Sequence, residues 1–313
     1  MEYRMTEKEC GMTVKSYLNT VLHLSGAQIT ALKKDPRGIL VGGEHVTVRY
    51  VLHAGDVLSL ADTDTACSDN IVPTAMPLNI LYEDDAILVI NKPPYMPTHP
   101  SHGHYTDTLA NGLAHLFEQR GIPFVFRSCS RLDRDTSGLV TVAKTRAAAY
   151  HFQCAHTAGE VGKEYLAVLT GHLTPAVGEI SGCIRRQEDS VITRIVTEND
   201  GAPALTRYRV LSRGSSPDGR PLTLVSAVPV TGRTHQLRVH FAHLGHPILG
   251  DFLYGEENDA LIGRQALHCR KTSFRHPVSG VPMTHRAAPP EDFAALLACF
   301  EQSEITHLFT RGD

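Results

Sequence analysis

A polar segment containing two prolines divides the chain. Residues 61–77 are rich in Asp, Thr, Ser and Asn, include Pro73 and Pro77, and separate two stretches that are richer in apolar residues. Such a composition is typical of a linker between folded units. Over the 313 residues, the sequence predicts a small unit at 1–62, a linker at 63–77, a large unit at 78–300 and a tail at 301–313.

The small unit combines two helical patterns with strand patterns. Apolar residues recur at helical spacing over 13–24, and Ser25 could cap a second helix over 27–34. Alternating segments follow at 39–41 and 45–51, with turn signals at 42–43 and 54–56. We therefore expect a small α+β unit.

In the large unit, strand and helix patterns follow no regular alternation. Helical patterns occupy residues 108–119, 144–156, 236–244 and 290–300, and strand patterns occupy residues 80–82, 86–90, 139–143, 165–169, 222–228 and 266–274. Because the strands are not matched one for one with crossover helices, the predicted fold class is α+β, with a mixed, largely antiparallel sheet.

Composition restricts the class of protein further. The net charge of −3 gives no overall attraction to a polyanion, so any nucleic-acid contact needs a local basic surface. The seven cysteines form no C-x-x-C pair, which favours reduced thiols over a zinc cluster or disulfides. No apolar run approaches membrane-spanning length, and the N-terminus has no signal-peptide pattern. We expect a cytoplasmic, monomeric protein without a membrane partner.

Three segments concentrate polar groups between apolar strands. The first, residues 131–138, reads Arg-Leu-Asp-Arg-Asp-Thr-Ser-Gly and places two carboxylates and two guanidiniums before a strand. Catalytic groups often project from such loops, but charges alone favour an ordinary surface turn. A carboxylate pair for glycoside hydrolysis is a poor match, because Asp133 and Asp135 are too close in sequence to flank a sugar.

The second segment, residues 231–241, contains Arg233 on a turn after a strand, where a fixed cation could keep a buried carboxylate ionised. Four histidines lie in or just beyond it, but no nearby Glu completes a zinc signature, so packing or RNA contact is favoured over metal binding. They are His235, His240, His243 and His246.

The third segment, residues 264–286, has five basic residues and no acidic one, which suggests a phosphate-binding strip or a solvated hairpin. The five are Arg264, Arg270, Lys271, Arg275 and Arg286.

Taken together, these segments resemble the RluA family of pseudouridine synthases. Residues 131–144 are similar to its active-site motif, and further matches follow in order along residues 78–290: Asn91-Lys-Pro-Pro, Lys163-Glu-Tyr, Thr231-Gly-Arg-Thr-His-Gln-Leu-Arg-Val-His, Gly245-His-Pro-Ile-Leu-Gly-Asp and Leu267-His-Cys. The chain departs from the family at Ser130, where His is usual, and at Cys269, where Ala is usual.

The resemblance implies a catalytic function for three residues. Asp133 would be the catalytic aspartate, Tyr165 the ring that packs against the target base, and Arg233 the cation paired with Asp133. Substrate contacts would come from Arg131, which helps to displace the flipped nucleotide, from Leu267 at an apolar wall, and from the basic residues Arg270, Lys271 and Arg275. No metal or organic cofactor is implied, because the reaction only moves the bond between base and sugar.

Residues 1–62 resemble the alpha-L type RNA-binding module that often precedes this catalytic domain. Seven Lys and Arg balance seven Asp and Glu over this range, so strong electrostatic attraction to RNA is not expected. The expected substrate is structured RNA, with large-subunit ribosomal RNA first and transfer RNA second. A non-catalytic RNA-binding protein on the same scaffold and a nucleosidase remain as alternatives.

Overall fold

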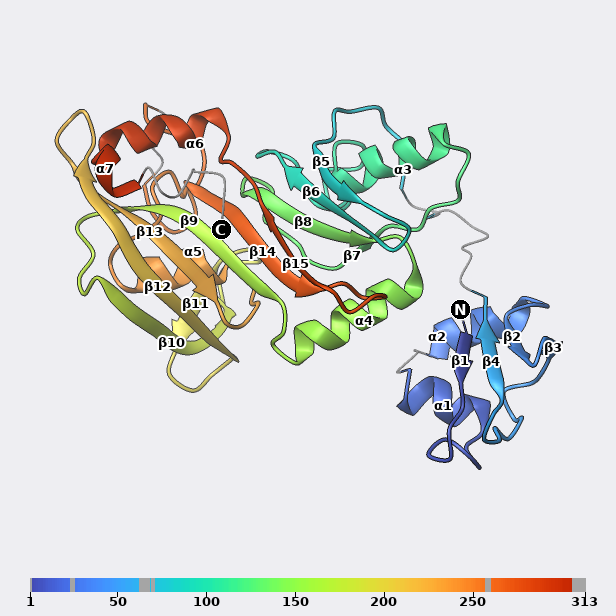
Figure 1. The fold of residues 1–313 in the computed structure, drawn as a ribbon. Helices are drawn as coiled ribbons and strands as arrows, with labels where there is room; N and C mark the ends of the chain where they lie inside the picture. Colours follow the sequence, from blue (N-terminus) through green and yellow to red (C-terminus); the bar gives the residue numbers. More distant parts are fainter. Residues whose placement is uncertain (1, 23–25, 62–67, 69–70, 257–259, 306–313) are drawn as a thin grey trace.

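The computed structural model describes residues 2–22, 26–61, 68, 71–256 and 260–305. Figure 1 shows a small N-terminal body and a larger body, and each contains its own β-sheet and its own apolar core. The expected cap at Ser25, residues 63–67 and 69–70 of the expected linker and residues 306–313 of the expected tail lie outside the described residues.

The N-terminal body is a four-stranded sheet with two helices. Thr13 begins α1, because its hydroxyl accepts a hydrogen bond from Ser16 N at 3.2 Å. The strand order is β1-β4-β2-β3, and all pairs are antiparallel. The elements are β1 (Glu2–Arg4), α1 (Val14–Thr20), α2 (Gly26–Lys34), β2 (Ile39–Val41), β3 (Glu44–His45) and β4 (Val57–Leu60).

The strand expected at residues 45–51 is wrong for most of its length. Only Glu44–His45 forms a strand. The carbonyls of Val48 and Tyr50 instead accept the first N–H groups of α1, from Lys15 and Val14, at 2.8 Å each. The first N–H groups of a helix have no acceptor within the helix and need one elsewhere. Because these two carbonyls fill that need, they are not available for the hydrogen bonds between strands.

The larger body is built on an eleven-stranded, mostly antiparallel sheet within the described residues. Nine strands follow the order β11-β10-β12-β13-β9-β14-β8-β6-β5, while β15 pairs with β14 and β7 with β8. The pairing of β14 with β8 is parallel. This confirms the predicted mixed α+β class. The strands are β5 (Ile80–Glu83), β6 (Ile87–Lys92), β7 (Arg127–Ser128), β8 (Ser137–Ala143), β9 (Gly162–Thr170), β10 (Val177–Arg186), β11 (Arg194–Thr197), β12 (Ala202–Ser215), β13 (Pro221–Pro229), β14 (Leu267–Arg275) and β15 (Pro282–Arg286).

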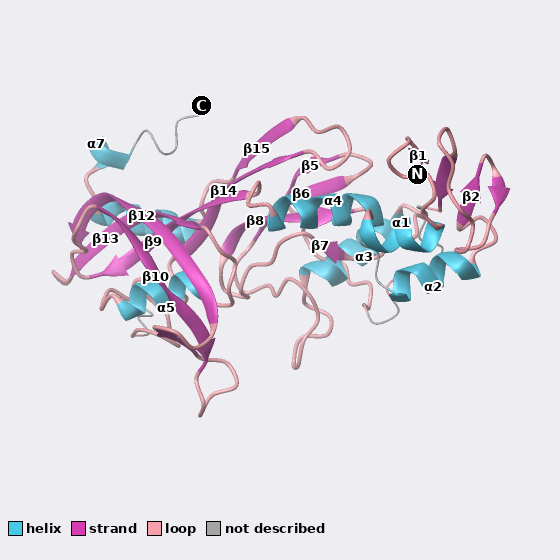
Figure 2. Ribbon diagram, turned by 90° about the horizontal axis from the view of Figure 1, so that it is seen from below, coloured by secondary structure: helices cyan, strands magenta, loops and turns pink. Residues whose placement is uncertain are grey.

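Helices cover both faces of this sheet. Figure 2 shows α5 and α7 on opposite sides of β9, β12 and β13. On the α5 side, Tyr208 of β12 packs edge-on against Phe241. On the other side, Phe293 of α6 lies against His268 of β14. The helices are α3 (Leu109–Gln119), α4 (Arg146–Thr157), α5 (Gln236–His243), α6 (Glu291–Leu296), the 3-10 turn η1 (Leu297–Cys299) and α7 (Gln302–Ile305).

The core of the larger body extends beyond the predicted boundary at residue 300. Ile305 of α7 is 1% exposed and belongs to the same apolar cluster as Phe293 and Phe300. The first residues of the expected tail therefore complete the fold.

Candidate active site

Asp133 lies in the loop that leads into β8. Its side chain is about one-fifth exposed, at 22%. The loop turns sharply, because Thr136 N donates to Asp133 O at 3.1 Å. Gly138, the second residue of β8, has φ +113°, and a Cβ there would lie 2.3 Å from Cys269 O of β14. Only glycine permits this close approach of the two backbones.

Buried side chains fix the backbone on either side of Asp133. Lys92 Nζ donates to Arg134 O at 3.0 Å, Thr98 Oγ1 to Leu132 O at 3.1 Å, and Arg264 Nη1 to Asp135 O at 2.9 Å. All three donors are at most 3% exposed. Because these carbonyls are hydrogen-bonded, the loop has little conformational freedom. A rigid loop can hold the carboxylate of Asp133 in a fixed orientation, as a catalytic group requires.

Burial lowers the pKa of Lys92 to about 7, whereas the carboxylates of Asp135 and Asp133 act to raise it. The ammonium group also donates to Pro93 O and Met96 O, at 2.9 and 2.8 Å. Lys92 therefore joins the Asn91-Lys-Pro-Pro segment to the Asp133 loop.

The cation beside Asp133 is Arg238 of α5. Its Nη1 lies 3.4 Å from Asp133 Oδ2, and its Nε and Nη2 bind Asp251 in a fork, at 2.7 Å each. Arg238 is 3% exposed and Asp251 is fully buried. Burial acts to lower the pKa of Arg238, but the hydrogen bonds and charge of Asp251 and the charge of Asp133 raise it above its usual value. The guanidinium is thus a permanent positive charge held at the carboxylate.

The expected pairing of Arg233 with Asp133 is wrong. Arg233 is exposed, and its Nε donates to Pro203 O at 2.9 Å. Arg233 belongs to the turn before α5, whereas Arg238 lies in the first turn of the helix, which carries its side chain into the interior. Sequence reasoning missed Arg238 and Asp251, although both stand in the segments that carry the family resemblance. Their spacing of thirteen residues gives no periodic signal that would have linked them.

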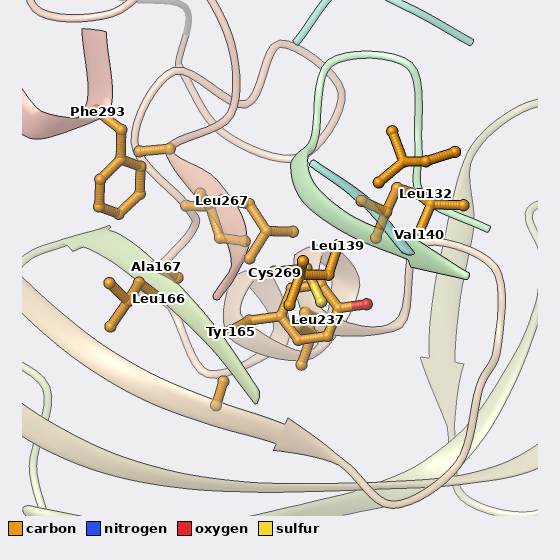
Figure 3. Close-up of a cluster of buried hydrophobic side chains, with 14 of the residues drawn as sticks. Leu132, Leu139, Val140, Tyr165, Leu166, Ala167, Leu237, Leu267, Cys269 and Phe293 are labelled. Carbon is orange, nitrogen blue, oxygen red and sulfur yellow. The ribbon is translucent and has the colours of Figure 1, made fainter. Parts of the chain in front are cut away.

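Tyr165 lies on the α5 face of the sheet. It pairs across the sheet with Cys269 of β14 and Ala227 of β13 and is 8% exposed. Figure 3 shows its ring beside Cys269, Leu139 and Leu237, in one cluster with Leu267. Burial raises the pKa of Tyr165 well above its usual range, and Cys269 and the charge of Asp133 add to this effect. The ring is therefore a neutral surface close to the carboxylate.

The basic residues of the third segment do not form one strip. Arg264 is buried and pairs with Asp292, with Nε 2.6 Å from Oδ2. Its guanidinium therefore stabilises the fold and is not available to bind phosphate. Arg270 Nε lies 3.6 Å from Glu164 Oε1, and Glu164 precedes Tyr165 on β9. Because neighbouring strand residues point to opposite faces, Arg270 lies on the face away from Tyr165. It is therefore not among the groups around Asp133.

Two other expected substrate contacts are exposed. Arg131 lies two residues before Asp133, and Arg275, at the end of β14, donates to Gly280 O at 3.2 Å. Lys271 is half-buried and faces Glu164 and Arg286 in the strand register. Of these, Arg131 alone belongs to the loop that carries Asp133.

The histidines have separate partners. His240 Nδ1 lies 3.0 Å from Thr206 Oγ1, His246 Nδ1 lies 2.9 Å from Thr170 O, and His235 Nδ1 lies 2.9 Å from Tyr254 Oη. Within the part of the chain that the structure describes, there is no group of three or more His, Cys, Asp and Glu side chains that could hold a metal ion. None of the described helices is long and apolar enough to cross a membrane.

Comparison with known proteins agrees with this geometry. Residues 86–243, which include Asp133, Tyr165 and Arg238, match the family model described as RNA pseudouridylate synthase. A Bacillus subtilis protein named uncharacterized RNA pseudouridine synthase YjbO is 40% identical over 91% of this chain and 98% of its own length. Ribosomal large subunit pseudouridine synthase D of Xanthomonas campestris is 37% identical over 85% of this chain and 78% of its own.

A solved structure supports the same assignment. Human RNA pseudouridylate synthase domain containing 1 is 32% identical, with a TM-score of 0.59 over 72% of this chain and 88% of its own. The family model and the relatives cover both the Asp133 loop and α5. The chain belongs to the RNA pseudouridylate synthase family and is an isomerase that acts on RNA.

Proposed function

We propose that this protein isomerises specific uridines of large-subunit ribosomal RNA, with Asp133 as the reacting carboxylate. The observation that carries the proposal is the contact of Arg238 Nη1 with Asp133 Oδ2, at 3.4 Å, beside the buried ring of Tyr165. A carboxylate fixed by a permanent cation and placed against an aromatic surface suits attack on the sugar of a nucleotide that has left its stack.

The isomerisation defines what the site must do. The bond between N1 of uracil and C1′ of the sugar breaks, the base turns, C5 bonds to C1′, and the proton on C5 is lost while N1 gains one. Substrate and product have the same atoms, so the reaction consumes no co-reactant. Asp133 acts at the sugar, either as nucleophile on C1′ or as base, and Arg238 keeps it charged while water is excluded.

Tyr165 and Leu267 supply the surface for the base. The ring of Tyr165 stacks against uracil in the proposed complex, and Leu267 extends the apolar wall on the same face of the sheet. Arg131 is exposed on the loop of Asp133 and takes the place of the flipped nucleotide in the RNA. Lys271 and Arg275 are proposed as more distant phosphate contacts.

The ribosomal target rests on the relatives. Those from Xanthomonas campestris and Yersinia pestis, at 37% and 38% identity, are named ribosomal large subunit pseudouridine synthase D. A ribosomal RNA substrate would place the protein in the cytoplasm, where we propose that it acts as a monomer. We also propose that residues 1–62 form an RNA-binding module that delivers the RNA to the larger body.

Chemical mapping of pseudouridine in total RNA, from cells with and without this protein, tests the proposal. We expect discrete uridines in large-subunit ribosomal RNA to lose the modification without the protein and to regain it with the wild type but not with Asp133→Asn. Loss confined to transfer RNA would contradict the ribosomal target. Release of free uracil by the purified protein would indicate a nucleosidase, and binding without any modification would indicate a non-catalytic protein.

A further inference from the structure

His235 has a backbone conformation that a residue with a side chain seldom adopts. Its φ is +58°, in the left-handed region, and it is the residue immediately before α5. Such a conformation costs about 1–2 kcal/mol for a residue other than glycine and persists only where its surroundings enforce it. Gln236 does so here: its Oε1 accepts from Arg233 N at 3.0 Å, and its Nε2 donates to Leu205 O at 2.9 Å. The turn therefore fixes the direction of the His235 side chain.

The hydrogen bonds of Tyr254 determine which nitrogen of His235 carries the proton. The hydroxyl oxygen of Tyr254 accepts a hydrogen bond from Arg194 N at 2.9 Å. Its own proton then needs an acceptor, and His235 Nδ1 lies 2.9 Å away. A neutral imidazole that accepts at Nδ1 carries its proton on Nε2.

The imidazole is neutral near neutral pH. Burial lowers the pKa of His235 below its usual value of 6.5, the charge of Asp133 acts to raise it, and the charges of Arg238 and Arg194 lower it further. Its side chain is 12% exposed, so the ring is largely shielded from water.

The protonated nitrogen faces the catalytic carboxylate. His235 Nε2 lies 4.0 Å from Asp133 Oδ2, and Arg238 Nη1 approaches the same oxygen at 3.4 Å. Two N–H donors from one helix end thus face a single carboxylate oxygen. The guanidinium of Arg238 also lies over the ring of Tyr254, 5.2 Å from its centre, which joins the three side chains into one group.

We propose that His235 is a positioning residue for the isomerisation, held by Tyr254 as the neutral tautomer with its proton on Nε2, and that with Arg238 it holds Asp133 Oδ2 so that Oδ1 faces the sugar of the target uridine. This assignment rests on the proposed function of Asp133. It also explains why the chain keeps a strained histidine at a position where glycine or asparagine would cost less.

The tautomer can be measured without substrate. Nitrogen-15 NMR of the full chain should show a non-protonated δ1 nitrogen and a protonated ε2 nitrogen for His235. In Tyr254→Phe, the signals should move toward a mixture of tautomers, because the hydroxyl that selects one is gone. A wild-type His235 protonated on Nδ1 would overturn the proposal.

Kinetics test the positioning effect with a matched pair of variants. His235→Leu and His235→Gln both keep a Cβ at the strained φ, but only Gln places a neutral N–H near the position of Nε2. We expect His235→Leu to slow the single-turnover rate by about tenfold, a barrier increase of about 1.4 kcal/mol, with RNA affinity within about twofold of wild type. His235→Gln should recover most of the rate, and His243→Leu, an exposed change on the same helix, should have no effect.

Three results would contradict the proposal: an unchanged rate in His235→Leu, a loss confined to RNA affinity, or a Gln variant as slow as the Leu variant. A Gln variant as slow as the Leu variant would mean that His235 has only a structural function. If the wild type isomerises no RNA at all, the proposed function fails, yet the NMR measurement still decides the tautomer. The two failures are therefore distinguishable.

Discussion

The Asp133 loop and the N-terminal body are stabilised by different means. Around Asp133, charged side chains are buried and bonded: Lys92, Arg238, Asp251 and Arg264 are all at most 3% exposed. The N-terminal core is made of apolar side chains such as Leu18, Leu52 and Leu58, and among the residues of this body whose burial the structure describes, Tyr17 is the one buried ionisable residue.

This difference is informative because burial of a charge carries a large desolvation cost, whereas burial of a leucine is favourable. A chain that tolerates several buried ions around one loop retains them for a purpose other than stability, and here they hold a carboxylate and its backbone. The described residues of the N-terminal body include no comparable group of buried charges. Its expected contribution is to bring RNA to the larger body.

The largest expected effect separates two arginines that stand five residues apart. Arg238→Met should lower the single-turnover rate on the order of 10²-fold, about 2.7 kcal/mol, because Asp133 loses the cation at 3.4 Å. Arg233→Met should stay within about threefold of wild type, since Arg233 is exposed and bonds Pro203 O.

Thermal unfolding of both variants is the control, because Arg238→Met also leaves Asp251 buried without its partner. If Arg238→Met fails to fold, Arg238→Lys keeps the positive charge and should retain more activity than Arg238→Gln. A larger kinetic loss from Arg233→Met than from any Arg238 variant would support the pairing of Arg233 with Asp133 that the sequence predicted. It would contradict the structure.

A second prediction compares buried and exposed histidines. His268 in the larger body is fully buried, with Nδ1 3.0 Å from Ser137 Oγ and Nε2 3.0 Å from Ala287 O. Burial lowers its pKa from 6.5 to about 4. Below pH 6.5, His268 therefore binds a proton in the unfolded chain, whereas in the folded chain it binds one only below about pH 4. Because the unfolded chain binds more protons between these values, the free energy of unfolding decreases as the pH falls through this window.

From about pH 7.5 to about pH 5, the contribution of His268 amounts to a loss of about 2 kcal/mol in the free energy of unfolding. Chemical denaturation at both pH values should show a smaller loss in His268→Gln than in the wild type, by that amount. His45→Gln, an exposed change in the N-terminal body, should leave the loss unchanged. Identical pH dependence in all three proteins would mean that His268 is protonated in the folded state.

The smallest effect concerns the N-terminal body. A protein that lacks residues 1–70 should fold, because the larger body has its own sheet and core. Its second-order rate on a short target RNA should be unchanged, whereas the rate on full-length RNA should fall about tenfold, or about 1.4 kcal/mol, through loss of a tethered contact.

Measurements at two salt concentrations complete this comparison. Because basic and acidic residues balance over 1–62, the lost factor should depend only weakly on salt. An equal loss on short and long RNA would mean that the N-terminal body shapes the active site itself. No loss on either would mean that it binds something other than this RNA.

Motifs and periodicity predicted much of the fold. The hairpin of β5 and β6, the helices α3 and α4 and the strands β8 and β9 lie within a few residues of their expected positions. The strands β10, β11 and β12 were not predicted. In β12, exposed arginines such as Arg207 and Arg209 alternate with buried residues such as Tyr208, so the strand has few apolar residues to mark it.

The site was predicted less completely than the fold. Asp133 and Tyr165 stand out because their motifs are local, and the structure places them together. Arg238 and Arg264 could not be assigned from sequence, since each depends on a partner that folding brings close. Asp292, for example, is twenty-eight residues from Arg264 and pairs with it only after α6 packs on the sheet. Sequence alone could not tell a buried arginine from one of a basic strip.

Release of the hydrogen on C5 tests the central claim most directly. RNA transcribed with uridine that carries tritium at C5 loses that tritium to water only when C5 becomes bonded to the sugar. We predict that the wild type releases tritium in proportion to the target uridines, and that Asp133→Asn releases none while its RNA affinity stays within about twofold of wild type. Tritium release by Asp133→Asn at the wild-type rate would contradict the account.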